Sequence, residues 1–119
     1  MNGRSSIGST GAQSSIALTL ELGRHLESVR LLLLSVKNGA DDIELDRRRA
    51  EQLLDRHRLL RRAASNAGDV ATGSILDRVE PYLLDIKHAT GEPEDTRWLQ
   101  LRLRDNPILT LVNVYETNP

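Results

Sequence analysis

The sequence predicts an all-α protein: an antiparallel bundle of about four helices with a proline-kinked third helix and a short C-terminal strand. Hydrophobic residues recur at steps of three and four over most of the chain, the spacing of one helical face. Hydrophobic residues make up 39% of the sequence and include no Phe and one Trp, so Leu, Ile, Val and Ala must build the core. Gly and Asn residues separate the periodic segments. At 119 residues, the chain has the length of one domain.

The N-terminal third combines a polar lead-in with an apolar helix. Residues 1–14 are rich in Gly and Ser, which predicts a flexible lead-in to a bundle over residues 15–106. In the next helix, extra leucines at positions 31, 32 and 34 widen the hydrophobic stripe, so we expect neighbours on two sides. Asn38-Gly39 is a typical helix stop. The residues of this stripe are Leu18, Leu22, Leu26, Val29, Leu33 and Val36.

Residues 41–67 form a long charged helix with one narrow apolar stripe. Asp41 or Asp42 is the expected N-cap. The charged side chains turn away from the stripe, which is too narrow to bury itself, so this helix needs partner helices. The stripe consists of Ile43, Ala50, Leu53, Leu54, His57, Leu60, Ala64 and Ala67.

A third helix follows Gly68-Asp69, with Asp69 as its expected N-cap. Its apolar spacing continues to Ala89, but Pro81 lies inside it. An interior proline costs about 3 kcal/mol unless the helix bends. We therefore predict a kink near residues 77–81, or a fresh helix start at Pro81. The apolar positions are Leu76, Val79, Leu83 and Ile86.

The last two elements differ in character. A Pro in the first turn, followed by acidic residues, predicts a short helix that ends before Asn106-Pro107. Residues 108–115 are β-branched and partly alternating, which predicts a strand within the 107–119 tail. A single strand is unstable in water, so we hypothesise that it pairs with its twin in a homodimer. The predicted contacts are Ile108, Thr110, Val112 and Val114.

Composition limits the classes of function. With 16 basic and 17 acidic residues the net charge is −1, which does not favour nucleic acid as a partner, and none is expected. The absence of Cys excludes thiolate metal sites, disulfides and cysteine nucleophiles. No apolar run approaches the roughly 20 residues of a membrane span, and the N-terminus lacks a signal-peptide pattern. The chain alone is expected to be soluble.

The histidines show no catalytic or metal-binding spacing. His25, His57 and His88 lie on three different predicted helices, and no pair is one helical turn apart. Ordinary packing or surface roles are therefore expected, with no metal and no cofactor. No nucleophile or phosphate-loop motif is present either, so we predict that the protein is not an enzyme.

An arginine-rich segment, residues 47–62, is the main charge feature. Anionic lipid, nucleic acid or an acidic partner helix are possible ligands, but neighbouring carboxylates neutralise much of the run. The expected pairs are Glu44–Arg48, Arg47–Glu51, Asp46–Arg49 and Asp55–Arg58. Arg61 and Arg62 are left unpaired by this scheme. The candidate partner-binding residues are Arg58, Arg61 and Arg62, together with the four in the predicted strand.

Several stretches together resemble a bacterial family. They are HLESVRLLLL at 25–34, RRRAEQLL at 47–54, LLRRAA at 59–64 and the proline-bearing ILDRVEPYLLDI at 75–86. These stretches are similar to the C-terminal, outward-facing domain of zinc-finger anti-sigma-factor-like membrane proteins, over residues 20–115. The finger's His/Cys ligands and the membrane span are absent from this sequence. The tail also departs, because the family usually carries Phe and basic residues there.

The resemblance implies a non-catalytic protein-interaction or sensory domain of an anti-sigma-factor-like transcription regulator, on the periplasmic side of the inner membrane. Membrane attachment would come only through a parent span. Sigma-factor binding would belong to the missing part, so no residue here is assigned to it. Two alternatives stay open: a stand-alone helical scaffold, and an anionic-surface binder that uses residues 47–62.

Overall fold

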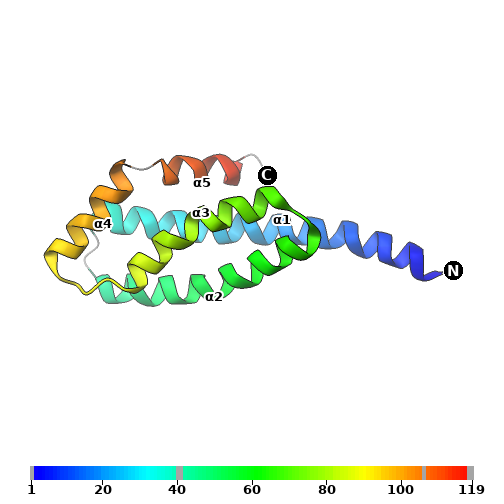
Figure 1. Cartoon of the computed structure of the whole chain (residues 1–119), viewed down its shortest axis with the longest axis horizontal. Helices are drawn as coiled ribbons and strands as arrows, with labels where there is room; N and C mark the ends of the chain where they lie inside the picture. Colours follow the sequence, from blue (N-terminus) through cyan, green and yellow to red (C-terminus); the bar gives the residue numbers. More distant parts are fainter. Residues whose placement is uncertain (1, 40–41, 106, 118–119) are drawn as a thin grey trace.

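The described residues form five α-helices and no strand in this computed structural model (Figure 1). The backbone is described for residues 2–39, 42–105 and 107–117, and the side chains for 17–39, 42–105 and 107–114. The all-α bundle is confirmed, with five helices instead of about four. Their bounds are α1 Asn2–Lys37, α2 Ile43–Ala67, α3 Val70–Lys87, α4 Pro93–Asp105 and α5 Ile108–Thr117.

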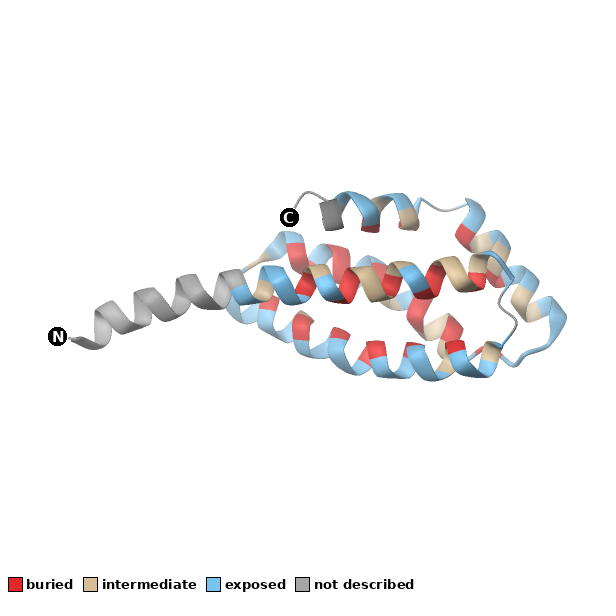
Figure 2. Ribbon diagram, turned by 180° about the vertical axis from the view of Figure 1, so that it is seen from behind, coloured by how far each residue is buried: buried red, intermediate tan, exposed pale blue. Residues whose placement is uncertain are grey.

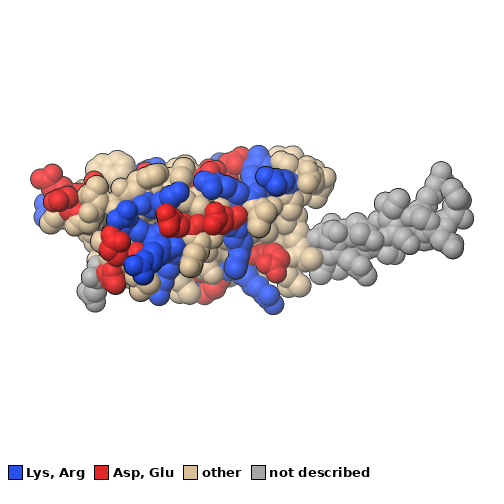
Figure 3. Space-filling view, turned by 90° about the horizontal axis from the view of Figure 1, so that it is seen from below, with Lys and Arg blue, Asp and Glu red and all other residues tan. Residues whose placement is uncertain are grey.

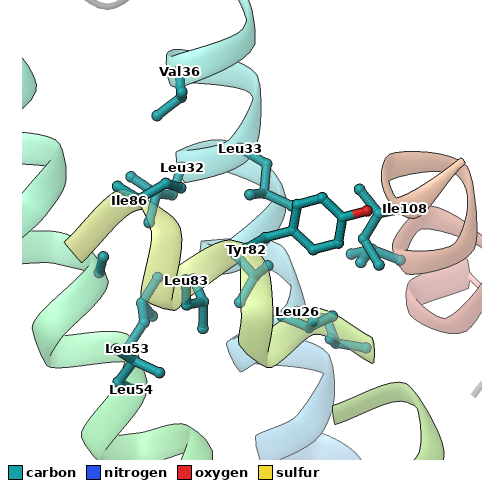
Figure 4. Close-up of a cluster of buried hydrophobic side chains, with 14 of the residues drawn as sticks. Leu26, Leu32, Leu33, Val36, Leu53, Leu54, Tyr82, Leu83, Ile86 and Ile108 are labelled. Atoms are coloured by element: carbon teal, nitrogen blue, oxygen red, sulfur yellow. The ribbon is translucent and has the colours of Figure 1, made fainter. Parts of the chain in front are cut away.

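Helix α1 is the element that most of the bundle packs against. It contacts α2, α4 and α5, while α3 packs mainly along α2. The predicted α1 stripe is buried, with Leu26, Val29, Leu33 and Val36 at 0% exposure. Figure 4 shows side chains from α1, α2, α3 and α5 meeting in one apolar cluster, with the Tyr82 ring near Leu33 and Ile108. This close-packed interior fixes the surfaces of α1 and α2 rigidly relative to each other.

The predicted helix boundaries between α1 and α3 are confirmed. The Asp42 carboxylate accepts a hydrogen bond from the backbone N–H of Leu45 at 3.1 Å and caps α2. Gly68 ends α2 with a φ of +68°, a conformation that side chains rarely adopt. The Asp69 carboxylate then accepts from the Thr72 N–H at 3.1 Å and caps α3. The turn between α2 and α3 is therefore short and fixed at both ends.

Helix α3 runs continuously through Pro81, so the predicted fresh start at this residue is wrong. Pro81 has no N–H to donate to the carbonyl of Asp77 one turn earlier. Both residues lie on the exposed side of α3, where that carbonyl is open to solvent. The predicted kink itself stays a prediction.

The N-terminal boundary differs from the expectation. Helix α1 begins at Asn2 and not near residue 15. The predicted flexibility of residues 1–14 concerns a segment whose side chains lie outside the described residues.

The predicted C-terminal strand is wrong, because residues 108–117 form helix α5. Ile108 and Val112, four residues apart, are buried against the rest of the bundle, and α5 packs on α1. The sequence contains both an alternating and an i,i+4 apolar pattern here. A helix satisfies its own backbone hydrogen bonds, whereas no described strand is present to pair with a strand, so packing overrides β propensity.

Candidate functional site

A groove lies between α1 and α2 on the outside of the bundle. Its floor is apolar and its rim is polar and basic. Figure 2 shows the exposed outer sides of these helices beside their buried stripes. We call this surface the α1–α2 groove; it is lined by Ser28, Leu31 and Leu32 of α1 and by Arg49, Gln52, Leu53 and Arg56 of α2.

Helix α2 has a second stripe that leads along this groove. Its members are separated by four, three, four and three residues, the same spacing as the buried stripe. All of them are exposed, with Leu59 at 65% and Leu45 at 42%. On α1, Leu31 is also 55% exposed. This outer stripe consists of Leu45, Arg49, Gln52, Arg56 and Leu59.

Arg49 and Arg56 carry the charge of the groove. Among the described side chains, neither arginine lies within ion-pair distance of a carboxylate, whereas Arg47 pairs with Glu44 at 2.6 Å and Arg58 reaches Asp55 at 3.9 Å. Figure 3 shows acidic and basic residues interspersed over the lower face of the bundle. Three of the seven arginines in the run are therefore paired locally, while the two guanidinium groups of the groove lie beside exposed leucine without a carboxylate at ion-pair distance among the described side chains.

Three of the predicted pairs on α2 are replaced by other contacts, beginning with Glu44, which pairs with Arg47 and not with Arg48. Arg47 pairs with Glu44 and not with Glu51, and its Nε donates to the backbone carbonyl of Lys87 at 3.3 Å. Asp46 turns into the interior, where the Ser35 hydroxyl donates to its carboxylate at 3.4 Å. Burial raises the pKa of Asp46 above its usual range. The predicted Asp46–Arg49 pair is absent, which leaves Arg49 available to the groove.

A pair of buried histidines joins three helices behind the groove. His25 Nε2 of α1 lies 2.9 Å from His57 Nδ1 of α2, and His57 Nε2 lies 2.7 Å from the carbonyl oxygen of Leu76 in α3. A carbonyl only accepts, so His57 Nε2 carries the proton and His57 Nδ1 is the acceptor. His25 Nε2–H then donates to it. Two neutral rings satisfy this chain of hydrogen bonds, each with its proton on Nε2.

Burial holds both histidines in the neutral form. His25 is 0% exposed, and desolvation, helped by the nearby His57 and the Arg56 charge, lowers its pKa to about 3. Desolvation also lowers the pKa of His57, against the hydrogen bond to Leu76 and the charges of Glu80 and Asp77. His25 Nδ1 is buried without a hydrogen-bond partner. The expected packing role fits this pair, although the sequence did not predict their contact.

The third histidine does not join the pair. His88 is exposed and caps the C-terminus of α3. Within the described part of the chain, no three His, Asp or Glu side chains come together as a metal site would require. A search of the described helices finds none with the length and apolar character needed to cross a bilayer.

The arginines predicted to bind a partner do not lie in the groove. Arg61 was expected to be unpaired, which is wrong: its Nε and Nη2 donate to the two carboxylate oxygens of Asp77 on α3 at 2.8 and 3.2 Å. Its guanidinium also covers Gly73, where an added Cβ would lie 3.2 Å from Arg61 Nη1. Arg62 is exposed, and no partner within ion-pair distance is found among the described residues.

The four tail residues proposed as a dimer edge are divided between core and surface. Ile108 is 3% and Val112 0% exposed, so both are core residues of α5. Thr110 and Val114 are exposed on its other side. Because these residues form a helix, the proposed strand pairing cannot occur, and homodimerisation needs a different surface.

Comparison with known proteins gives no further assignment: no family model, no curated protein and no solved structure matches this chain.

Sequence reasoning overlooked the groove because it considered the apolar stripes and the arginine run separately. The outer stripe of α2 has leucine only at its ends and places Arg49, Gln52 and Arg56 between them. A search for any 3/4 repeat of large side chains, polar ones included, would have revealed a second organised face. The contact between His25 and His57 joins residues 32 positions apart, which no local pattern reports.

Proposed function

We propose that this chain is a non-catalytic protein-interaction domain that binds an acidic amphipathic helix in the α1–α2 groove. The observation that carries the proposal is the combination of exposed Leu31 with unpaired Arg49 and Arg56 on one rigid groove. Leucine favours the apolar stripe of a helix, and the arginines favour carboxylates beside that stripe. The floor is supported from behind by the buried core, so little ordering is needed on binding.

The sequence resemblance supplies the proposed context. In an anti-sigma-factor-like regulator, such a groove would serve as a sensory or assembly surface on the periplasmic side of the membrane. The reading frame upstream of this segment in its genome tests that context. A zinc finger and an apolar span encoded in the same frame would support it, and a frame without them would contradict it and favour a stand-alone scaffold.

A peptide titration followed by NMR tests the groove itself. The probe is a synthetic 15-residue amphipathic helix with leucine on one stripe and glutamate on both flanks. A second peptide with lysine in place of glutamate is the control. We expect the acidic peptide alone to shift the backbone amide signals of residues 28–32 and 49–56. The double variant R49E/R56E should prefer the lysine peptide. Absence of binding, or shifts confined to other helices, would refute the proposal.

The anionic-surface alternative is tested in the same way with different probes. The local pairing of Arg47, Arg58 and Arg61 predicts weak, salt-sensitive attraction to polyanions in general. We expect no binding to anionic vesicles or duplex DNA at physiological salt. Binding that R49E/R56E and R58E/R62E weaken equally would support the alternative over a specific groove.

A further inference from the structure

A second exposed stripe, on helix α4, has the chemistry that the α1–α2 groove requires. Trp98 is 56% and Leu101 46% exposed, although both are large and apolar. Glu94 and Asp105 flank them, at spacings of four, three and four residues along one side of the helix. We call these four residues, Glu94, Trp98, Leu101 and Asp105, the α4 stripe. It presents an apolar centre with a carboxylate at each end.

The α4 stripe cannot enter the groove of its own chain. Leu99 and Leu103, on the opposite side of α4, are 4% and 2% exposed and hold this helix against the bundle. Figure 1 shows α4 at one end of the molecule, against α1. The stripe therefore faces away from the bundle that carries it.

Trp98 is held in place for contact. The Arg102 guanidinium lies 5.3 Å from the centre of the Trp98 ring and 4.7 Å from that of Tyr82. Arg102 is itself paired with Asp85 of α3. A fixed, half-exposed Trp loses little freedom when it is buried, which is why Trp so often dominates interface energies.

We infer that the occupant of the α1–α2 groove is helix α4 of a second copy of this chain. This inference rests on the proposed function and names its partner. The α4 stripe is about 16 Å long at 1.5 Å per residue, shorter than the roughly 21 Å from Leu45 to Leu59 on the outer stripe of α2. Trp98 and Leu101 cover Leu31 and Leu53, and the carboxylates approach Arg49 and Arg56.

The remaining charges fix how α4 lies in the groove. Arg97 and Arg104 border the α4 stripe on the side of Leu101, away from Trp98. They avoid Arg49 and Arg56 when that side turns toward α1 and away from α2. The Trp98 side then faces α2, and Arg102, the cation on that side, stays paired with Asp85 beside the Trp98 ring.

Each chain offers both a groove and an α4 stripe, so a two-fold arrangement of two copies would use both pairs of surfaces at once. That arrangement is a closed, two-fold dimer in which the same contact occurs twice. It replaces the strand pairing that the helical tail excludes.

Sedimentation velocity on the full 119-residue chain tests this dimer. We expect a concentration-dependent monomer–dimer equilibrium that W98A weakens by at least about tenfold, as loss of an interface hot spot does. R49E/R56E and E94R/D105R should each be monomeric. The double variant R58E/R62E makes the same charge change elsewhere on α2 and should dimerise as the wild type does.

Mixing the two charge-reversed variants provides the sharpest test. In the mixed dimer, the acidic groove of R49E/R56E meets the basic stripe of E94R/D105R, and the two unaltered surfaces also meet. Dimers should therefore reappear only in the mixture. Circular dichroism of each variant confirms its folding independently.

Three results would overturn the inference: wild-type chains that remain monomeric up to about 1 mM, corresponding to about 4 kcal/mol of association free energy, dimers indifferent to W98A, or no recovery on mixing. If the wild type is monomeric but still binds the acidic peptide, the proposed function holds and only the inference that a second copy is the partner is wrong. Absence of peptide binding by the monomeric variant E94R/D105R, whose groove is unaltered and free of α4, would remove the proposed function itself.

Discussion

Two of the polar contacts that join helices α2 and α3 start one helical turn apart on α2, from His57 and from Arg61, and they differ in burial and in charge. His57 donates to the Leu76 carbonyl inside the core, where both groups are shielded from water. Arg61 pairs with Asp77 at the surface, through two hydrogen bonds in ideal fork geometry. The exposed pair has the greater formal charge, but water and salt weaken it. The buried contact is neutral. Breaking it leaves buried polar atoms without a hydrogen-bond partner, which costs more than losing an exposed pair.

The largest effect is expected at the buried contact. The substitution His57→Ala opens a cavity and leaves both the His25 Nε2–H and the Leu76 carbonyl without this partner. We expect a loss of about 3 kcal/mol or more in the free energy of unfolding, measured by urea denaturation. His88→Ala, at an exposed helix end, is the control and should change little. A loss below about 1 kcal/mol at His57 would show that the pair is not a structural link.

The second-largest loss in the free energy of unfolding is expected when acid protonates the buried histidines. The pKa of His25 is about 3 in the folded chain and 6.5 in the unfolded chain. Between these values the unfolded state binds more protons, so stability falls as the pH drops below 6.5. His25 alone should cost about 2 kcal/mol at pH 5, and His57, with a pKa shifted in the same direction, adds to it.

Urea denaturation from pH 8 to pH 4 measures this effect as the difference between the wild type and H25L/H57L. The subtraction cancels the carboxyl groups, including Asp46, whose raised pKa acts with the opposite sign. Parallel pH profiles for the two proteins would contradict the assigned neutral state.

A substitution in the turn between α2 and α3 should have an intermediate effect on the free energy of unfolding. Gly68 has a φ of +68°, and a Cβ there would meet no atom within 4 Å, so Gly68→Ala introduces backbone strain without a clash. We expect a loss of about 1 kcal/mol. Gly23→Ala, which also has open space but lies inside α1, should instead stabilise the chain by a similar amount. Changes of the same sign at both glycines would rule out strain as the cause.

The exposed pair should have the smallest effect. Arg61→Ala and Asp77→Ala should each lower the midpoint of thermal unfolding less than His57→Ala does, and the double variant should lose little more than either single one. Raising the salt concentration toward 1 M should erase much of the difference from the wild type. A loss that persists at high salt would mean that packing of the Arg61 guanidinium over Gly73 matters more than its charge.

Features that depend on residues close together in the sequence could be predicted, whereas features that depend on contacts between different helices could not. Helices α1 to α4 were predictable because caps such as Asp42 and Asp69, and repeats such as Leu26 to Leu33, act within one or two turns. Helix α5 was not predictable because Ile108 and Val112 also fit a strand, and only the surface of α1 decides between the two. The site residues were missed for the same reason. Arg49 became available only because Asp46 turned inward to Ser35, a contact between different helices.

The hydrogen-bonded imidazoles also provide a built-in reporter. Two ring protons, on His25 Nε2 and His57 Nε2, follow one another along a chain of hydrogen bonds in the buried interior between three helices. Neither can exchange with deuterium until those helices separate, so the slower of the two exchange rates measures how often the bundle opens. A partner that clamps the outside of α1 and α2 should slow that exchange even though it never touches either ring.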